Sequence, residues 1–108
     1  MGYLFLAIAI VSEVAATSSL KLASGDKPPV WAIVTVVVGY LLAFAMLRQT
    51  LAAGVPLGTA YAIWAGIGVV AVALVGRLAF AEVLAWPQVL GVALVAAGVA
   101  LVELGHPT

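Results

Sequence analysis

The stretch "YLFLAIAIVSEVAATSSLK", residues 3–21, decides how this chain folds. It is one continuous segment of apolar and small residues, with a single carboxylate at Glu13 and a lysine at its end. A run of roughly 20 mainly apolar residues is long enough to cross a bilayer as a helix. We therefore expect a transmembrane helix over about 3–20 that carries an acidic side chain inside it.

The composition of the whole chain indicates the same environment. Of the 108 residues, 67% are hydrophobic and only 7% are charged, and the mean hydropathy is +1.33. Soluble domains are closer to half apolar and a quarter charged. Four Lys and Arg balance four Asp and Glu, so there is no basic surface for nucleic acid. With no cysteine and one histidine, His106, we expect neither a metal site nor a cofactor. The chain is predicted to be an integral membrane protein.

Three further apolar stretches follow the first, over about 30–47, 59–76 and 86–104. They are separated by "ASGDKPP" (23–29), by "AAGVPLG" (52–58) and by a break that Glu82 and Pro87 mark. Connections this short favour antiparallel neighbouring helices. We expect an all-α protein with four transmembrane helices that form a single transmembrane domain over 1–108.

Glu13 is the one charged residue that lies deep in a predicted span. It is about ten residues from Tyr3, which at roughly 1.5 Å per residue places it about 15 Å into a ~30 Å hydrocarbon core. The other charged residues lie near the ends of the spans, where they reach the headgroups. Three basic residues, Lys21, Lys27 and Arg77, fall on one side and Arg48 on the other. This weak bias allows insertion in both orientations.

Two interpretations of Glu13 remain open from the residues themselves. A protonated Glu13 could serve a close helix contact, because Ala9, Ala16 and Thr17 lie beside it and are small. Alternatively, it binds a proton or a cation, as ionisable residues inside membranes commonly do. We favour the second, since no Lys or Arg lies deep enough to pair with it. One carboxylate that holds either a proton or a cation makes the two mutually exclusive, which is the minimum chemistry of an antiporter.

Aromatic pairs supply candidate walls for a cation. Tyr61 and Trp64 are three residues apart in the third span, and Tyr40 and Phe44 are four apart in the second. Aromatic faces attract cations when water is excluded, although ordinary aromatic packing is the alternative.

Pairs of glycines mark two further positions. Gly66 and Gly68 favour a bend or a close approach in the third span, or a packing role alone. Gly91 and Gly98, two turns apart in the fourth span, are typical of a close helix interface in lipid. We interpret them as an oligomer seam.

These residues together resemble the small multidrug resistance family over nearly the whole chain. The resemblance rests on "EVAATSSLK" with Glu13, on "PLGTAYAIWAGIG" (56–68) and on the Gly91/Gly98 pair. It implies a four-helix protomer that pairs as an antiparallel homodimer of dual topology in the bacterial cell membrane. It also implies proton-coupled export of organic cations, with protons and substrate sharing Glu13.

The resemblance also assigns roles residue by residue. It implies substrate-lining roles for Ala9, Thr17, Tyr40, Phe44, Tyr61 and Trp64. It implies the helix bend at Gly66 and Gly68 and the dimer seam at Gly91 and Gly98.

The subtype follows from Ala16, which stands where guanidinium exporters of this family typically carry Trp. This favours the multidrug, quaternary-ammonium branch, with guanidinium export as the alternative. The loop "SGDKPPVW" (24–31), Ala45 and Glu103 depart from the family pattern. A proteolipid-like membrane subunit, or the partner of a homologous chain, is a further alternative. An enzyme is not expected, because no nucleophile–base pair is visible.

Overall fold

The computed structural model describes residues 1–105 and is helical apart from its short connections. The helices are α1 (Gly2–Ala23), α2 (Val30–Ala52), α3 (Leu57–Ala79) and α4 (Trp86–Leu104). Each of these four described helices is long and apolar enough to cross a membrane. The prediction of an all-α fold with four candidate transmembrane helices is confirmed. His106 lies outside the described residues.

Helix ends are set by prolines, glycines and backbone turns. Pro29 and Pro56 precede the first residues of α2 and α3, where the fixed φ of proline is compatible with a helix start. The chain leaves α2 through Gly54, whose φ of +102° is in the region that glycine adopts most readily. Three of the helices, α1, α2 and α3, extend beyond the membrane spans expected from the sequence. The charged residues there mark a membrane boundary, and a helix can continue past that boundary into the headgroups.

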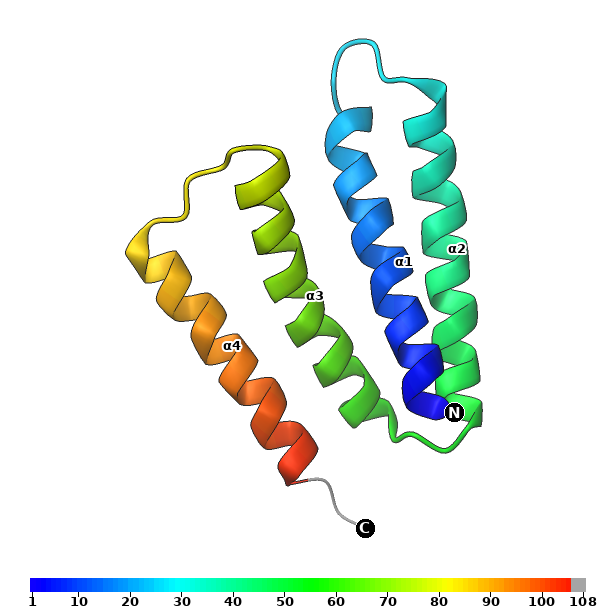
Figure 1. Ribbon diagram of the computed structural model, residues 1–108. Coiled ribbons are helices and arrows are strands. Elements are labelled where there is room, and N and C mark those ends of the chain that lie inside the picture. The colour runs from blue at the N-terminus through cyan, green and yellow to red at the C-terminus, as the bar shows by residue number, and fades with distance from the viewer. Residues whose placement is uncertain (106–108) are drawn as a thin grey trace. The chain divides into compact units, whose positions relative to one another are not determined.

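The chain divides into two compact units, Met1–Val55 and a second that begins at Pro56. Each unit is a helical hairpin: α1 packs against α2, and α3 packs against α4 (Figure 1). In the first hairpin the contact is made by small residues, and Ala9, Ala16, Ala32 and Ala43 are fully buried. Small side chains let helix backbones approach closely, which is how helices associate where lipid gives no hydrophobic driving force.

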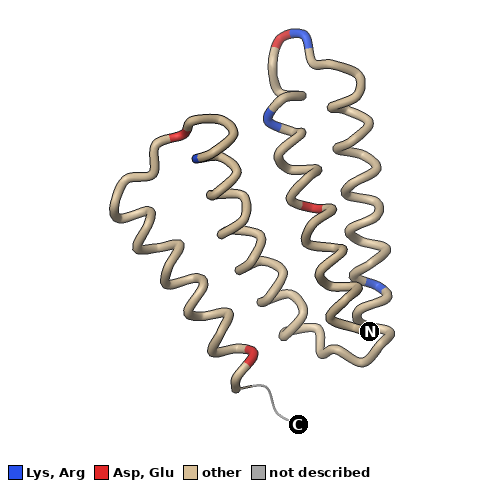
Figure 2. The backbone as a smooth tube through the Cα atoms, in the orientation of Figure 1, with Lys and Arg blue, Asp and Glu red and all other residues tan. Residues whose placement is uncertain are grey.

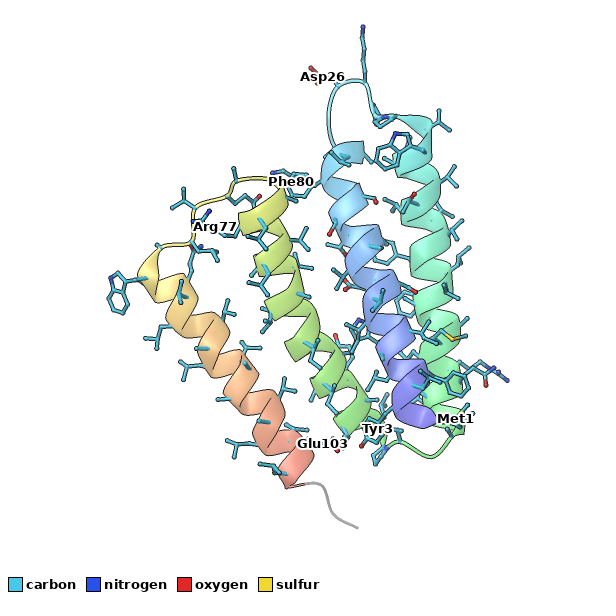
Figure 3. All side chains as sticks on the ribbon, in the orientation of Figure 1. Met1, Tyr3, Asp26, Arg77, Phe80 and Glu103 are labelled. Carbon is cyan, nitrogen blue, oxygen red and sulfur yellow. The ribbon has the colours of Figure 1, made fainter. Side chains whose placement is uncertain are left out.

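Large apolar side chains are exposed on the outside of all four helices, among them Val11, Leu41, Ile67 and Leu101. Charged residues are confined mainly to helix ends and loops, whereas one acidic residue lies in the middle of α1 (Figure 2). In Figure 3, Asp26 lies in the loop between α1 and α2, and Glu103 lies near the end of α4. This distribution suits a protein whose helices are surrounded by hydrocarbon.

Candidate functional site

Glu13 occupies the middle of α1, eleven residues after Gly2 and ten before Ala23. The helix continues on both sides because the neighbours of Glu13 are mostly alanine and larger apolar residues. Their side chains do not compete with the helix backbone for hydrogen bonds. The carboxylate is half-buried in the protomer. At about 1.5 Å per residue it lies roughly 15 Å from either end of the helix, so the carboxyl group is near the centre of this candidate transmembrane helix.

A chain of hydrogen bonds joins this carboxylate to α2. The Thr17 hydroxyl, one turn further along α1, donates to Glu13 Oε1 at 2.8 Å. The same Thr17 Oγ1 lies 2.8 Å from the hydroxyl of Tyr40 on α2. Three of the residues predicted for the site, Glu13, Thr17 and Tyr40, are therefore brought together in one continuous chain of polar atoms.

The neighbour of Tyr40 explains how α2 comes this close. A Cβ added to Gly39 would lie 2.7 Å from the Ala16 Cβ and 3.0 Å from the Ser12 carbonyl oxygen. Such distances are shorter than ordinary van der Waals contact, so position 39 accepts only a hydrogen. Gly39 thus lets the two helices cross at the level of Thr17. Sequence reasoning did not single out Gly39, although a lone glycine within "VTVVVGYLL" (34–42) is the signal that could have identified it.

The other predicted lining residues of the first hairpin differ in exposure. Ala9 is fully buried, so its methyl group contacts only protein in this conformation. Phe44, one turn beyond Tyr40, is 63% exposed. Their roles in lining a substrate site stay predictions.

In the second hairpin, Tyr61 and Trp64 differ in the same way. Trp64 is buried to 8% exposure, whereas Tyr61 is 65% exposed. Tyr61 lies four residues after the start of α3, and its exposed aromatic ring is available to a ligand, a lipid or another protein chain.

The glycines of the second hairpin fall into two kinds. Gly66 and Gly68 are buried in an uninterrupted α3, and a Cβ on Gly66 would collide with Val99 of α4. A Cβ on Gly91 or Gly98 would meet nothing within 4 Å. Gly66 therefore serves the contact between α3 and α4, while Gly91 and Gly98 present an open surface. The predicted bend and the predicted seam are not tested by these contacts.

The fold and this mid-helix carboxylate define a class of multi-pass membrane protein, and comparison with known proteins identifies the family. Residues 1–95 match the family described as Small Multidrug Resistance protein. The chain belongs to this family, which confirms the resemblance seen in its sequence and identifies it with a family of transporters, not enzymes.

Similar proteins come from several bacteria. The multidrug transporter PA4990 of Pseudomonas aeruginosa is 44% identical over 103 residues, covering 95% of this chain and 92% of the relative. The multidrug resistance protein EbrB of Bacillus subtilis is 44% identical over 102 residues, covering 94% and 86%. The quaternary ammonium compound-resistance protein QacF of Klebsiella aerogenes is 41% identical over 103 residues, covering 95% and 92%.

Proposed function

We propose that this chain is a proton-coupled antiporter that exports hydrophobic and quaternary organic cations across the bacterial cell membrane. Protons and substrate compete for Glu13 of an antiparallel homodimer. The observation that carries the proposal is the position of Glu13: a half-buried carboxylate at the centre of a membrane-spanning helix, hydrogen-bonded by a neutral hydroxyl.

The chemistry of that position explains the coupling. Water is scarce at the middle of a bilayer, so a negative charge there is costly unless a cation is close to it. A proton neutralises the carboxylate by forming a covalent bond, and an organic cation does so by lying beside it. Both cannot do so at once, so the arrival of one ligand drives the release of the other.

The class of cation follows from the groups near Glu13. Quaternary ammonium and phosphonium ions have no hydrogen to donate, and they are bound by carboxylate charge and by aromatic faces. Tyr40, Phe44, Tyr61 and Trp64 are the aromatic groups that we assign to the walls. Ala16 is fully buried against α2 and leaves no room for the Trp expected in a guanidinium exporter. The printed name of QacF, a quaternary ammonium compound-resistance protein, points to the same class of substrate.

The dimer is proposed from two features. Gly91 and Gly98 lie open on α4, and Leu94 between them is 64% exposed. Within α4, all of which the structure describes, no residue is buried. A second copy packed on this face would cover it and would supply a second Glu13. A homologous partner chain in place of the second copy is the alternative.

Electrophysiology on proteoliposomes attached to a solid-supported membrane tests the proposal. Tetraphenylphosphonium, a methylated quaternary ammonium ion and guanidinium are applied in turn under a proton gradient. We expect currents with the first two from the wild type, none from Glu13→Gln, and wild-type currents from Asp26→Asn, whose carboxylate is exposed in a loop. Proton-driven currents from Glu13→Gln would overturn the mechanism, and currents with guanidinium alone would assign the chain to the other branch of the family.

A further inference from the structure

The direction of the hydrogen bonds between Glu13, Thr17 and Tyr40 depends on whether Glu13 holds a proton. An ionised carboxylate can only accept hydrogen bonds, and a threonine hydroxyl has one hydrogen and two lone pairs. Because Thr17 donates its only hydrogen to Glu13 Oε1, its oxygen must accept from Tyr40 across the 2.8 Å contact. With Glu13 ionised, the chain therefore runs from the Tyr40 hydrogen through Thr17 to Glu13.

We propose that protonation of Glu13 reverses this chain, so that the Tyr40 hydroxyl presents lone pairs to the substrate site when Glu13 is ionised and a hydrogen when it is protonated. This inference rests on the proposed function and deepens it: Thr17 is a positioning residue that carries the state of Glu13 to Tyr40.

The protons balance without any transfer along the chain. A proton bound to Glu13 gives a carboxylic acid, whose O–H can donate to Thr17 Oγ1. The Thr17 hydrogen then turns to the Tyr40 oxygen, and the Tyr40 hydrogen turns away from Thr17 to another acceptor. Each hydroxyl keeps its own hydrogen and only rotates, so Tyr40 stays neutral in both states.

This reversal strengthens the competition between proton and cation. A phenol oxygen whose hydrogen is engaged elsewhere offers negative lone pairs to a cation, whereas an O–H that points outward offers a positive hydrogen. Tyr40 therefore attracts a cation when Glu13 is ionised and repels it when Glu13 holds a proton. Glu13 on α1 and Tyr40 on α2 then both contribute to the mutual exclusion of proton and cation.

Other titratable groups lie too far away to produce the same effect. In this hairpin they are the N-terminus, Tyr3 and Lys21 of α1, Asp26 and Lys27 in the loop that follows, and Arg48 of α2, each at least eight residues along the chain from Glu13 and from Tyr40. Eight residues correspond to roughly 12 Å of helix rise. The adjacent Ser18 hydroxyl provides a matched control, because its buried oxygen has no hydrogen-bond partner in the described part of the chain.

Carbon-13 NMR of the full-length protein in lipid tests the reversal. Glutamate Cδ and tyrosine Cζ are labelled, and Glu13→Gln and Tyr40→Phe assign the two resonances. We expect the Tyr40 Cζ resonance to shift with the same pH midpoint as the Glu13 Cδ resonance in the wild type, in Thr17→Ser and in Ser18→Ala. In Thr17→Val, which has the shape of threonine without its hydroxyl, Glu13 should still titrate while the Tyr40 shift is lost.

Two outcomes would overturn the inference. In the first, the Tyr40 Cζ resonance of the wild type does not change over the pH range in which the Glu13 Cδ resonance shifts. In the second, the Tyr40 resonance shifts with Glu13 as much in Thr17→Val as in the wild type. Addition of tetraphenylphosphonium at a pH where Glu13 is protonated separates this failure from failure of the proposed function. If the Glu13 resonance does not move to its ionised position, proton–cation competition itself is wrong, whatever Tyr40 does.

Discussion

At the scale of single residues, the chemistry that we propose for this protein depends on one carboxylate in a place where charge is costly. Glu13 is held by Thr17 on its own helix and, through Thr17, by Tyr40 on α2. A neutral hydroxyl stabilises the ionised form without neutralising it, so the site still requires a proton or a cation. A lysine in place of Thr17 would neutralise the Glu13 carboxylate permanently and would remove the need for a proton or a cation.

A prediction about pH follows from this competition. In the proposed mechanism the cation binds the ionised carboxylate, so lowering the pH converts the site to a form that cannot bind the cation. We expect the apparent Kd for tetraphenylphosphonium to rise about tenfold for each pH unit below the titration midpoint of the site, if one proton is exchanged per cation. Above that midpoint the Kd should become constant. Isothermal titration calorimetry in detergent between about pH 5 and 9 measures this, and a flat Kd throughout would contradict it.

At the scale of the helices, the α1–α2 crossing decides whether Thr17 can reach Tyr40. The crossing is close because Gly39 faces Ala16 and the Ser12 carbonyl. The chain would otherwise favour alanine at position 39, since alanine is a better helix former than glycine by about 1 kcal/mol. Overpacking at a tight contact costs about 1–3 kcal/mol. This cost is larger than the gain in helix propensity, so glycine is favoured at position 39.

We therefore predict that Gly39→Ala destabilises the protein and weakens cation binding, because the helices must separate. Thermal unfolding in detergent gives the first effect and calorimetry the second. The cost should be smaller in an Ala16→Gly background, where the nearest methyl group is absent. Gly58→Ala in α3 is the matched control: its Cβ would meet nothing within 4 Å, so it should stabilise slightly. Stabilisation by Gly39→Ala as well would contradict the close crossing.

The sequence predicts the helices and the acidic centre well, because both follow from local features. Hydrophobic length predicts the four helices, and a charge within an apolar run identifies Glu13. Spacing by four residues along one helix places Thr17 beside it. The contact with Tyr40 was not predictable, because it depends on the register between two helices, which is set by the Gly39–Ala16 contact and not by any period within either helix. Three of the helices also extend beyond the expected membrane spans, since charges mark the membrane boundary whereas glycines and prolines mark the end of the helix.

At the scale of the whole molecule, one protomer supplies one carboxylate at the centre of a candidate transmembrane helix. Two protomers would supply two copies of Glu13, Tyr61 and Trp64. If one copy is inverted, the inward-open and outward-open states become equivalent, as in transporters built from inverted repeats. The three-to-one distribution of basic residues between the two sides is weak enough to allow both insertions.

This predicts dual topology, which cysteine labelling can measure. The chain has no cysteine, so single replacements at Ser24 and at Ala53, in loops at opposite ends of α2 and both exposed, report orientation directly. Intact cells are treated with an impermeant maleimide. We expect each site to be labelled in about half of the molecules, and the remainder only after permeabilisation. If one site is labelled completely and the other not at all, the antiparallel homodimer is wrong and a partner chain of opposite orientation is required.

The most direct measurement of proton–cation exchange at Glu13 is the number of protons released when a cation binds. Purified protein in weakly buffered detergent solution, at a pH below the titration midpoint of the site, is mixed with tetraphenylphosphonium while the pH is recorded. Exchange at Glu13 predicts proton release from the wild type and from Asp26→Asn, and none from Glu13→Gln. Cation binding by the wild type without proton release, or undiminished release from Glu13→Gln, would contradict it.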